Sequence, residues 1–364
     1  MRMFCAALVA ASACMSAQAH PVFILNDVGG VGAGTQARAG FAAAVALWSA
    51  AFSNNVTIRL DVGFQQLGSG ILGETSSSST DVSYSAVRAK LRARNANATE
   101  QGTAASLDPT LAFMSNSSNG GSSLATHVWD ASNNYDSQYL NVNTAEQRAL
   151  GLLSNADPTV DASITLGSSF KWDFNATNGV SSGFYDFVGI AAHEIGHALG
   201  FVSGVDVADE YAKFGYGGLE QSAWGTPLDL FRYQNGVRDW TVGGAPCFSI
   251  DDGATCGATF ATGYYLGDHY QASHWKNGKN WGIMGPSAVA GHALQISGND
   301  LAAFDAIGWN LASSSGSLAG AHWATDLSTA GTGGSANLLV PEPAAIALLA
   351  LGVAGIVRVR RQRG

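Results

Sequence analysis

Two histidines and a glutamate within residues 193–197 have the types and the spacing that metal chemistry requires. His193 and His197 are four residues apart, so one turn of a helix places both imidazoles on the same face. Two neutral imidazoles help to hold Zn²⁺, and the ion lowers the pKa of a water molecule that it binds. Glu194 lies beside the first histidine, where its carboxylate can take the proton of that water. The segment therefore predicts a zinc site with its own general base.

The residues around this segment predict the helix that it needs. Six apolar side chains make it a well-buried helix: Val188, Ile190, Ala191, Ile195, Ala198 and Leu199. The HExxH pattern is typical of zinc-dependent peptidases. Gly200 stands where the HExxHxxG metzincins, which the segment resembles, need a glycine to turn the chain. Ser203 occupies the position at which most metzincins place the third ligand, and because a serine hydroxyl is a poor zinc ligand, that ligand must come from elsewhere.

A second cluster of histidines downstream supplies candidates for the third ligand. His274 is followed directly by Trp275, and Met284 lies further along the same segment. Here the chain resembles the leishmanolysin-like metzincins, in which a long insertion separates the helix from the third histidine and a methionine-containing turn lies under the metal. The resemblance implies that His274 is the third ligand and that Met284 belongs to that turn. His269 is the alternative third ligand, and Asp206 is a weaker one.

The same resemblance implies an activity and a fold. The protein is expected to be an exported zinc endopeptidase of the α+β class, with a twisted mixed sheet, an active-site helix and a smaller C-terminal lobe. Glu194 is expected to act as general base in the hydrolysis of a protein or peptide substrate. The family layout also predicts that a strand within residues 161–174 forms the sheet edge that holds the substrate backbone.

Two other functions agree with parts of the sequence. A non-catalytic cell-surface or biofilm-matrix protein could use the metal for stability alone. Such a structural site needs no base and usually closes its fourth position with a ligand, so the intact Glu194 favours an enzyme. A copper oxidase acting on polysaccharide would use His20 at the mature N-terminus, but one histidine does not establish that site.

The composition excludes several classes of protein. Of the 364 residues, 46% are hydrophobic and 12% are charged, and the formal net charge is −9. Intrinsic disorder requires low hydrophobicity and high net charge, so the chain as a whole is predicted to fold. An acidic chain without a dense patch of Lys and Arg repels phosphates, which excludes a nucleic-acid partner.

Both ends of the chain carry predicted targeting signals. Arg2, an apolar run and Ala17-Gln18-Ala19 predict a secretory signal peptide that is cleaved after Ala19. At the other end, Pro341-Glu342-Pro343, an apolar stretch and a cluster of arginines resemble a PEP-CTERM sorting signal. The resemblance implies transient inner-membrane anchoring by a short transmembrane segment and removal of the tail by an exosortase-type enzyme. It also implies a location at the cell surface or in the extracellular matrix of a Gram-negative bacterium.

The chain is therefore divided into four segments: a signal peptide at 1–19, a zinc metallopeptidase domain at 20–311, a Ser/Gly/Thr-rich linker at 312–339 and the sorting signal at 340–364. Two cysteines remain after the signal peptide is removed. Cys247 and Cys256 bracket a short Asp/Gly-rich loop, which predicts a small disulfide in an oxidising compartment.

Hydrophobic periodicity locates several elements of the predicted domain. Residues 22–25 and 56–62 are predicted to be strands, because apolar side chains are continuous or alternate there. Residues 36–53 are predicted to form an alanine-rich helix and 300–311 a short amphipathic one. The polar run at 73–80 is predicted to be a loop.

Overall fold

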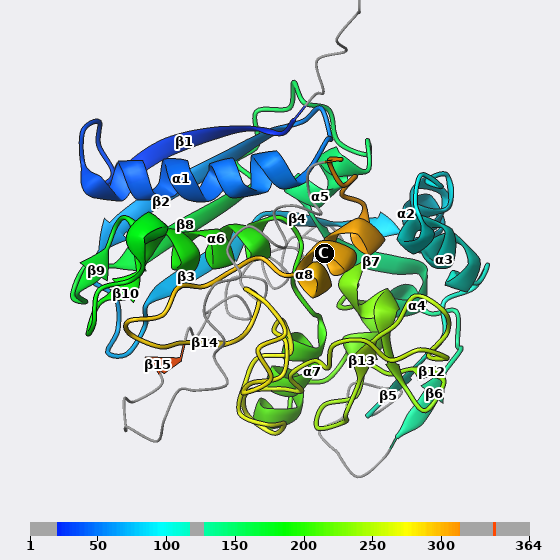
Figure 1. The fold of residues 1–364 in the computed structure, drawn as a ribbon. Helices are drawn as coiled ribbons and strands as arrows, with labels where there is room; N and C mark the ends of the chain where they lie inside the picture. The colour runs from blue at the N-terminus through cyan, green and yellow to red at the C-terminus, as the bar shows by residue number, and fades with distance from the viewer. Residues whose placement is uncertain (1–19, 117–126, 314–337, 340–364) are drawn as a thin grey trace, which may run out of the picture.

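The computed structural model describes residues 20–116, 127–313 and 338–339 (Figure 1). The predicted signal peptide, most of the linker and the sorting signal lie outside these residues. Within the described part of the chain, no helix combines the length and the apolar character needed to cross a membrane. The expected transmembrane segment, at 340–364, falls outside the described residues.

One open sheet of four strands forms the framework of the protein, in the order β1-β2-β8-β3. Its strands are β1 (Val22–Gly29), β2 (Thr57–Gln65), β8 (Ala162–Gly167) and β3 (Gly73–Ser77). The first three strands run parallel, whereas β3 pairs with β8 in the antiparallel direction. The fold is thus of the α+β class with a mixed sheet, and the strands predicted at 22–25 and 56–62 are confirmed.

The edge of this sheet differs from the prediction. The strand predicted within 161–174 is β8, but β8 pairs with β2 on one side and with β3 on the other, so it is an internal strand. The edge strand beside β8 is β3, in the run that is predicted to be a loop, and β1 forms the opposite edge of the sheet. The inward-facing residues of β3, Gly73, Thr75 and Ser77, are small, and they lie beneath a helix rather than among large apolar side chains. Strand β3 has Thr75 as its one β-branched residue and has no aromatic residue, which is a weak sequence signal for a strand.

Two helices, α1 (Gln36–Ala51) and α6 (Phe187–Ala198), cover one face of the sheet (Figure 1). The face beneath them is apolar because alternate residues of each central strand point toward the helices, as Ile58 and Leu60 do. The indole N–H of Trp48 on α1 donates to the carbonyl oxygen of Ala192 on α6 at 2.8 Å. Helix α1 therefore fixes α6 above the sheet.

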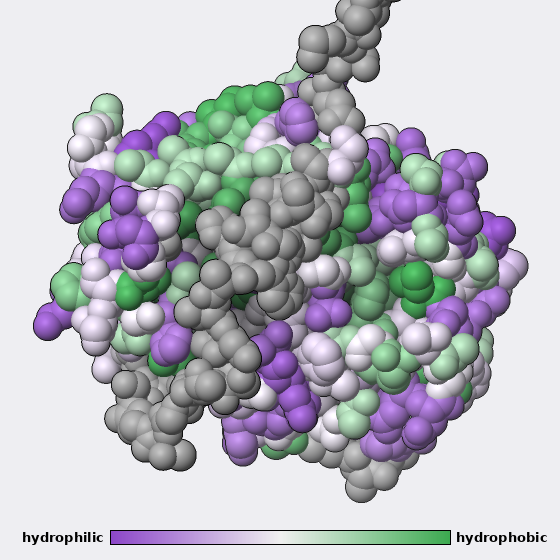
Figure 2. Space-filling model, in the orientation of Figure 1, coloured by the Kyte–Doolittle hydropathy of each residue, from purple (hydrophilic) through white to green (hydrophobic). Residues whose placement is uncertain are grey.

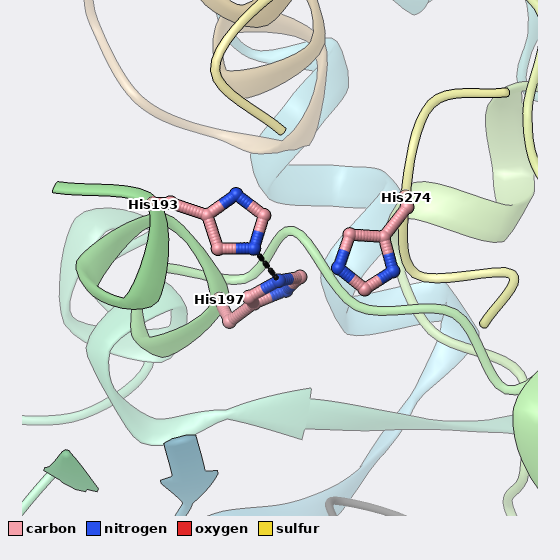
Figure 3. A group of neighbouring side chains, drawn as sticks. All are labelled: His193, His197 and His274. Atoms are coloured by element: carbon pink, nitrogen blue, oxygen red, sulfur yellow. Dashed lines mark hydrogen bonds between the residues drawn. The ribbon is translucent and has the colours of Figure 1, made fainter. Parts of the chain in front are cut away.

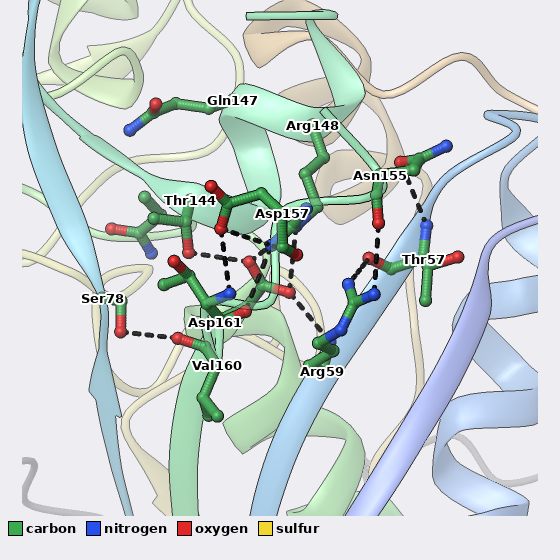
Figure 4. A network of polar contacts seen from close by, with 12 residues as sticks. Thr57, Arg59, Ser78, Thr144, Gln147, Arg148, Asn155, Asp157, Val160 and Asp161 are labelled. Carbon is green, nitrogen blue, oxygen red and sulfur yellow. Dashed lines mark hydrogen bonds and ion pairs between the residues drawn. The ribbon is translucent and has the colours of Figure 1, made fainter. Parts of the chain in front are cut away.

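A buried ion pair ties the sheet to the segment behind α6 (Figure 4). Arg148, on helix α5 (Thr144–Ala149), lies 2.9 Å from the carboxylate of Asp161, and both side chains are fully buried. The same carboxylate accepts hydrogen bonds from the Thr144 hydroxyl and from the backbone N–H of Arg59 on β2. Asn143, directly before α5, donates to the carbonyl oxygen of His197 at 3.0 Å. The ion pair thereby helps to position the C-terminal end of α6.

The remaining elements are short and lie mainly in the lower and right-hand parts of Figure 1. The remaining helices are α2 (Tyr84–Arg92), α3 (Ala98–Ser106), α4 (Tyr135–Gln138), α7 (Val205–Phe214) and α8 (Gly298–Ile307), with 3₁₀ turns η1 (Ala176–Asn178), η2 (Leu219–Gln221) and η3 (Leu228–Phe231). The remaining strands are β4 (Ser79–Ser83), β5 (Phe113–Ser115), β6 (Val128–Asp130), β7 (Tyr139–Asn143), β9 (Trp172–Asp173), β10 (Tyr185–Asp186), β11 (Arg232–Gln234), β12 (Val237–Arg238), β13 (Cys247–Phe248), β14 (Ser287–Ala288) and β15 (Leu338–Leu339).

Helix α8 brings the chain back to helix α1. It begins with a capping box, in which Ser297 and Asp300 exchange hydrogen bonds with each other's backbone. Its Phe304 ring packs against Trp48 with 4.7 Å between centroids. The amphipathic helix predicted at 300–311 is thus confirmed in place, but it begins slightly earlier, at Gly298, and ends at Ile307 rather than at 311. In Figure 2 the surface over α1 and β1 is largely apolar, whereas the region of α2 and α3 is more hydrophilic.

Candidate metal centre

Helix α6 carries two of the three histidines of the centre and its glutamate. Asp186 caps the helix, since its carboxylate accepts a hydrogen bond from the N–H of Gly189 at 2.9 Å. His193, Glu194 and His197 are buried, with no more than 1% of any of them exposed. The local helix therefore places three polar side chains in the protein interior, where each needs a partner.

The Nδ1 atoms of both helical histidines are held by backbone carbonyls. His193 Nδ1 lies 2.7 Å from the carbonyl oxygen of Ile283, and His197 Nδ1 lies 2.7 Å from that of Phe201. A carbonyl can only accept, so each Nδ1 donates, and in the neutral form of each ring Nε2 therefore keeps its lone pair. The turn at Gly200, with a φ of 115°, brings the Phe201 carbonyl back toward the helix. These contacts fix the tautomer that a metal ligand needs.

His274 joins the two helical histidines from a loop that faces α6, and the three rings point toward one another (Figure 3). The three potential ligand atoms all lie within 4.8 Å of one another. Burial and the neighbouring histidines hold the pKa of His197 well below its ordinary value, and burial with His193 does the same for His274. These two rings are therefore neutral near pH 7, which is the form that binds a metal.

The donor set fits a cation. Nε2 of His193 and Nε2 of His197 are 3.1 Å apart, and when both rings are in the neutral form that donates through Nδ1, neither Nε2 has a proton to place between them. Nε2 of His274 and Oε1 of Glu194 are buried, and neither has a hydrogen-bond partner among the described residues. A bound metal ion satisfies the nitrogen atoms together, which makes this cluster a candidate metal site.

The loop that carries His274 is held by a carboxylate of helix α7. Asp206 accepts hydrogen bonds from the N–H of Ala272 at 2.6 Å and from both the N–H and the hydroxyl of Ser273. Asp206 therefore lies beside the cluster as an anchor and is not a member of it. The other alternative ligand, His269, is exposed, and its Nδ1 contacts the carbonyl oxygen of Tyr264. Of the three candidates, His274 alone joins the described cluster.

A second carboxylate, Asp300 at the start of α8, connects the loop to the methionine turn. One of its oxygens accepts from the Trp275 indole N–H at 2.8 Å and from the Met284 N–H at 3.2 Å. The other oxygen accepts from the N–H of Ile283 at 2.9 Å and from that of Ser297 at 2.7 Å. Because the carbonyl of Ile283 holds His193, this one buried carboxylate is linked to both sides of the cluster.

Met284 is fully buried against the helix that carries His193 and His197. A side chain on Gly196 of α6 would overlap with the Met284 sulfur, so glycine at this position allows the methionine to approach. The backbone carbonyl of Met284 accepts from the N–H of Trp275, which follows the third histidine. The methionine thus lies between the helix and the loop.

Sequence reasoning missed the anchoring carboxylates and one residue beside the glutamate. The spacing of Ser297 and Asp300 is a capping signal that marks the start of a helix, but it says nothing of the methionine turn. Asp206 was considered only as a ligand. Thr75, which donates to Glu194, lies in a run without any strand or site signal.

Two further predicted features lie outside the cluster. Cys247 and Cys256 form a disulfide with 5.5 Å between their Cα atoms. The Nδ1 atom of His20 lies 3.0 Å from the carbonyl oxygen of Ser49 and 2.9 Å from that of Phe52. This ring nitrogen is therefore already engaged by the backbone.

Comparison with known proteins places one part of the chain. Residues 339–362 match the PEP-CTERM protein-sorting motif. The chain carries this sorting motif. The match supports export, recognition by an exosortase-type system, C-terminal processing, and a cell-surface or extracellular location in a Gram-negative bacterium. Neither a curated protein nor a solved structure matches the chain, so membrane anchoring and the likeness to leishmanolysin-like metzincins stay predictions.

Proposed function

We propose that this protein is an exported zinc endopeptidase of the metzincin type, similar to the leishmanolysin-like enzymes. The observation that carries the proposal is the convergence of His193, His197 and His274 beside a buried glutamate. Three histidines are the ligand number of catalytic zinc sites, which keep a position open for water or substrate. A structural zinc site would have a fourth protein ligand, and the described cluster has three histidines.

Zinc suits this donor set because neutral imidazoles are among its preferred ligands. When bound, zinc supplies Lewis acidity, which makes a water molecule more acidic and polarises a substrate carbonyl. His193, His197 and His274 would hold the ion, and the carbonyls of Ile283 and Phe201 would keep two of these rings in the required tautomer.

Glu194 is suited to move the proton in peptide hydrolysis. Its Oε2 accepts from Thr75, while its Oε1 is buried without a partner among the described residues and has the capacity to accept a proton. As general base, Glu194 takes a proton from the attacking water. As general acid, it then returns that proton to the amine that leaves when the peptide bond breaks.

The edge strand β3 is suited to hold the substrate. It is the terminal strand of the sheet, and its Thr75 contacts the glutamate directly. An extended peptide that pairs with β3 would add one strand to the sheet and lie beside the cluster. The role that was expected of a strand within 161–174 thus passes to β3.

Metal content and peptide hydrolysis test the proposal together. We expect about one zinc per chain by elemental mass spectrometry, the stoichiometry of a single site. We expect casein hydrolysis that stops on addition of a chelator. Glu194→Ala should keep the zinc and lower the hydrolysis rate by about 10²- to 10⁴-fold, the usual contribution of a general base.

Each of the other possible results leads to a different conclusion. Zinc without hydrolysis would contradict the peptidase and support the metal-stabilised surface protein. Hydrolysis that persists in Glu194→Ala would contradict the proposed role of the glutamate. A protein without bound zinc would contradict both functions.

A further inference from the structure

The inward face of β3 lies directly against the metal-binding turn of α6. Alternate residues of a strand share one face, so Gly73, Thr75 and Ser77 all lie on the face of β3 that is turned toward the helix. The Ser77 hydroxyl lies 3.5 Å from the carbonyl oxygen of His197. Each of these small residues therefore lies beneath the segment that carries the glutamate and the second histidine.

Thr75 makes the closest polar contact with Glu194. Its hydroxyl lies 2.8 Å from Oε2 of the carboxylate and 3.1 Å from the backbone oxygen of the same residue. Both side chains are buried, Thr75 with 1% of its surface exposed and Glu194 with none. A hydroxyl has one proton to donate. The carboxylate is both the nearer and the stronger of the two acceptors. Thr75 therefore donates to Oε2.

The other oxygen of the carboxylate lies beside Gly73, which has no side chain. A Cβ atom on residue 73 would overlap with Oε1 of Glu194, so a larger residue would displace this oxygen. A glutamate side chain has several rotatable bonds, whereas the β-branched Thr75 is stiff at χ1 and sits on a paired strand. The strand thus provides a rigid donor on one oxygen and, because residue 73 has no side chain, room for the other oxygen beside Gly73.

We propose that Thr75 is a positioning residue that holds Glu194 by Oε2 and directs its Oε1 to the reacting water. This inference rests on the proposed function, because the catalytic group that Thr75 acts through is the general base of that reaction. Supporting groups of this kind commonly change activity by about 10- to 100-fold when they are removed.

The test compares two substitutions at position 75 with a matched control in the full-length protein. Thr75→Val keeps the shape and removes the hydroxyl, whereas Thr75→Ser keeps the hydroxyl. Thr165→Val makes the same change on the neighbouring strand β8, at a half-buried residue of the opposite face. The measurements are kcat and KM on a peptide substrate, zinc content, and crystal structures of the wild type and the Thr75→Val variant.

We expect Thr75→Val to lower kcat by about 10- to 100-fold, with unchanged zinc content and with KM within about twofold. Thr75→Ser should recover most of the rate, and Thr165→Val should match the wild type. In the crystal structure of Thr75→Val, the Glu194 carboxylate should leave its position.

An unchanged kcat in Thr75→Val would overturn the inference, and so would a Glu194 carboxylate that stays in place. If the wild type cleaves no peptide, the proposed function fails, and the crystal structures still decide whether Thr75 positions Glu194. A variant that loses zinc would show that Thr75 supports the fold of the site and not the base specifically.

Discussion

The two halves of the metal centre are built in different ways. His193, Glu194 and His197 lie on one regular helix, where the backbone alone fixes their spacing. His274 and Met284 lie in a loop region without a long helix or strand, and the carboxylates of Asp206 and Asp300 hold the backbone of this region in place. A helix thus supplies geometry through its own hydrogen bonds, whereas a loop needs acceptors from elsewhere in the chain.

The carboxylates of the loop half lose solvent when the protein folds, and this has an energetic cost. Burial raises the pKa of Asp206 to about 7 and also raises that of Asp300, because the charged form loses solvent. Hydrogen bonds from backbone and side-chain donors oppose that shift at both residues. The helix half uses one buried carboxylate, Asp186 at the start of α6, and otherwise relies on the hydrogen bonds of the helix, so the loop half is expected to be the more sensitive half.

The largest effect should come from removing a ligand from either half. We expect His197→Ala and His274→Ala each to reduce bound zinc from about one per chain to nearly none, since two histidines hold zinc weakly. Elemental mass spectrometry on purified variants measures this. His269→Ala is the control and should keep its zinc. If His269→Ala lost the metal while His274→Ala kept it, the assignment of the third ligand would be wrong.

A smaller but still large effect is expected from Asp300→Asn. Each carboxylate oxygen accepts two hydrogen bonds, so the new NH₂ group would face two donors in place of an acceptor. We expect the free energy of unfolding to fall by about 3 kcal/mol, and zinc affinity to fall by about 10- to 100-fold.

Urea unfolding and competition with a chelating dye measure the two effects. Asp61→Asn, at a residue of β2 outside the buried core, is the matched control and should change neither. Equal zinc affinity in Asp300→Asn and the wild type would show that the loop half needs no such anchor.

The smallest of these effects is expected from Asp206→Asn. The amide oxygen can still accept from the Ser273 N–H and hydroxyl, so only the bond from Ala272 is lost. We expect a loss of stability of about 1–2 kcal/mol and a zinc affinity about 10-fold lower. The same titrations apply, and a larger effect than in Asp300→Asn would reverse the order of the two anchors.

The helix half of the site could be predicted from the sequence alone. Four-residue spacing within an apolar, periodic segment decides that His193 and His197 share a face, and no distant residue is needed for that conclusion. The same local rules placed the strand at 56–62 and the helix at 36–53, close to the observed β2 and α1.

The loop half required a family resemblance in addition to the residues. Residues 193 and 274 are far apart in the chain, so neither spacing nor periodicity could choose between His274 and His269. The structure brings His274 to the cluster because Asp206 and Asp300 hold the loop from two other helices. These contacts join residues that lie far apart in the sequence, where local patterns carry no signal.

The sequence by itself determined the helix that carries the candidate metal ligands, the candidate base and the sorting motif, since each is encoded in adjacent or periodically spaced residues. Only the tertiary structure decided which strand forms the edge of the sheet and that Thr75 contacts Glu194. The physical reason is that β3 consists of small and polar residues whose strand conformation depends on pairing with β8 and packing under α6.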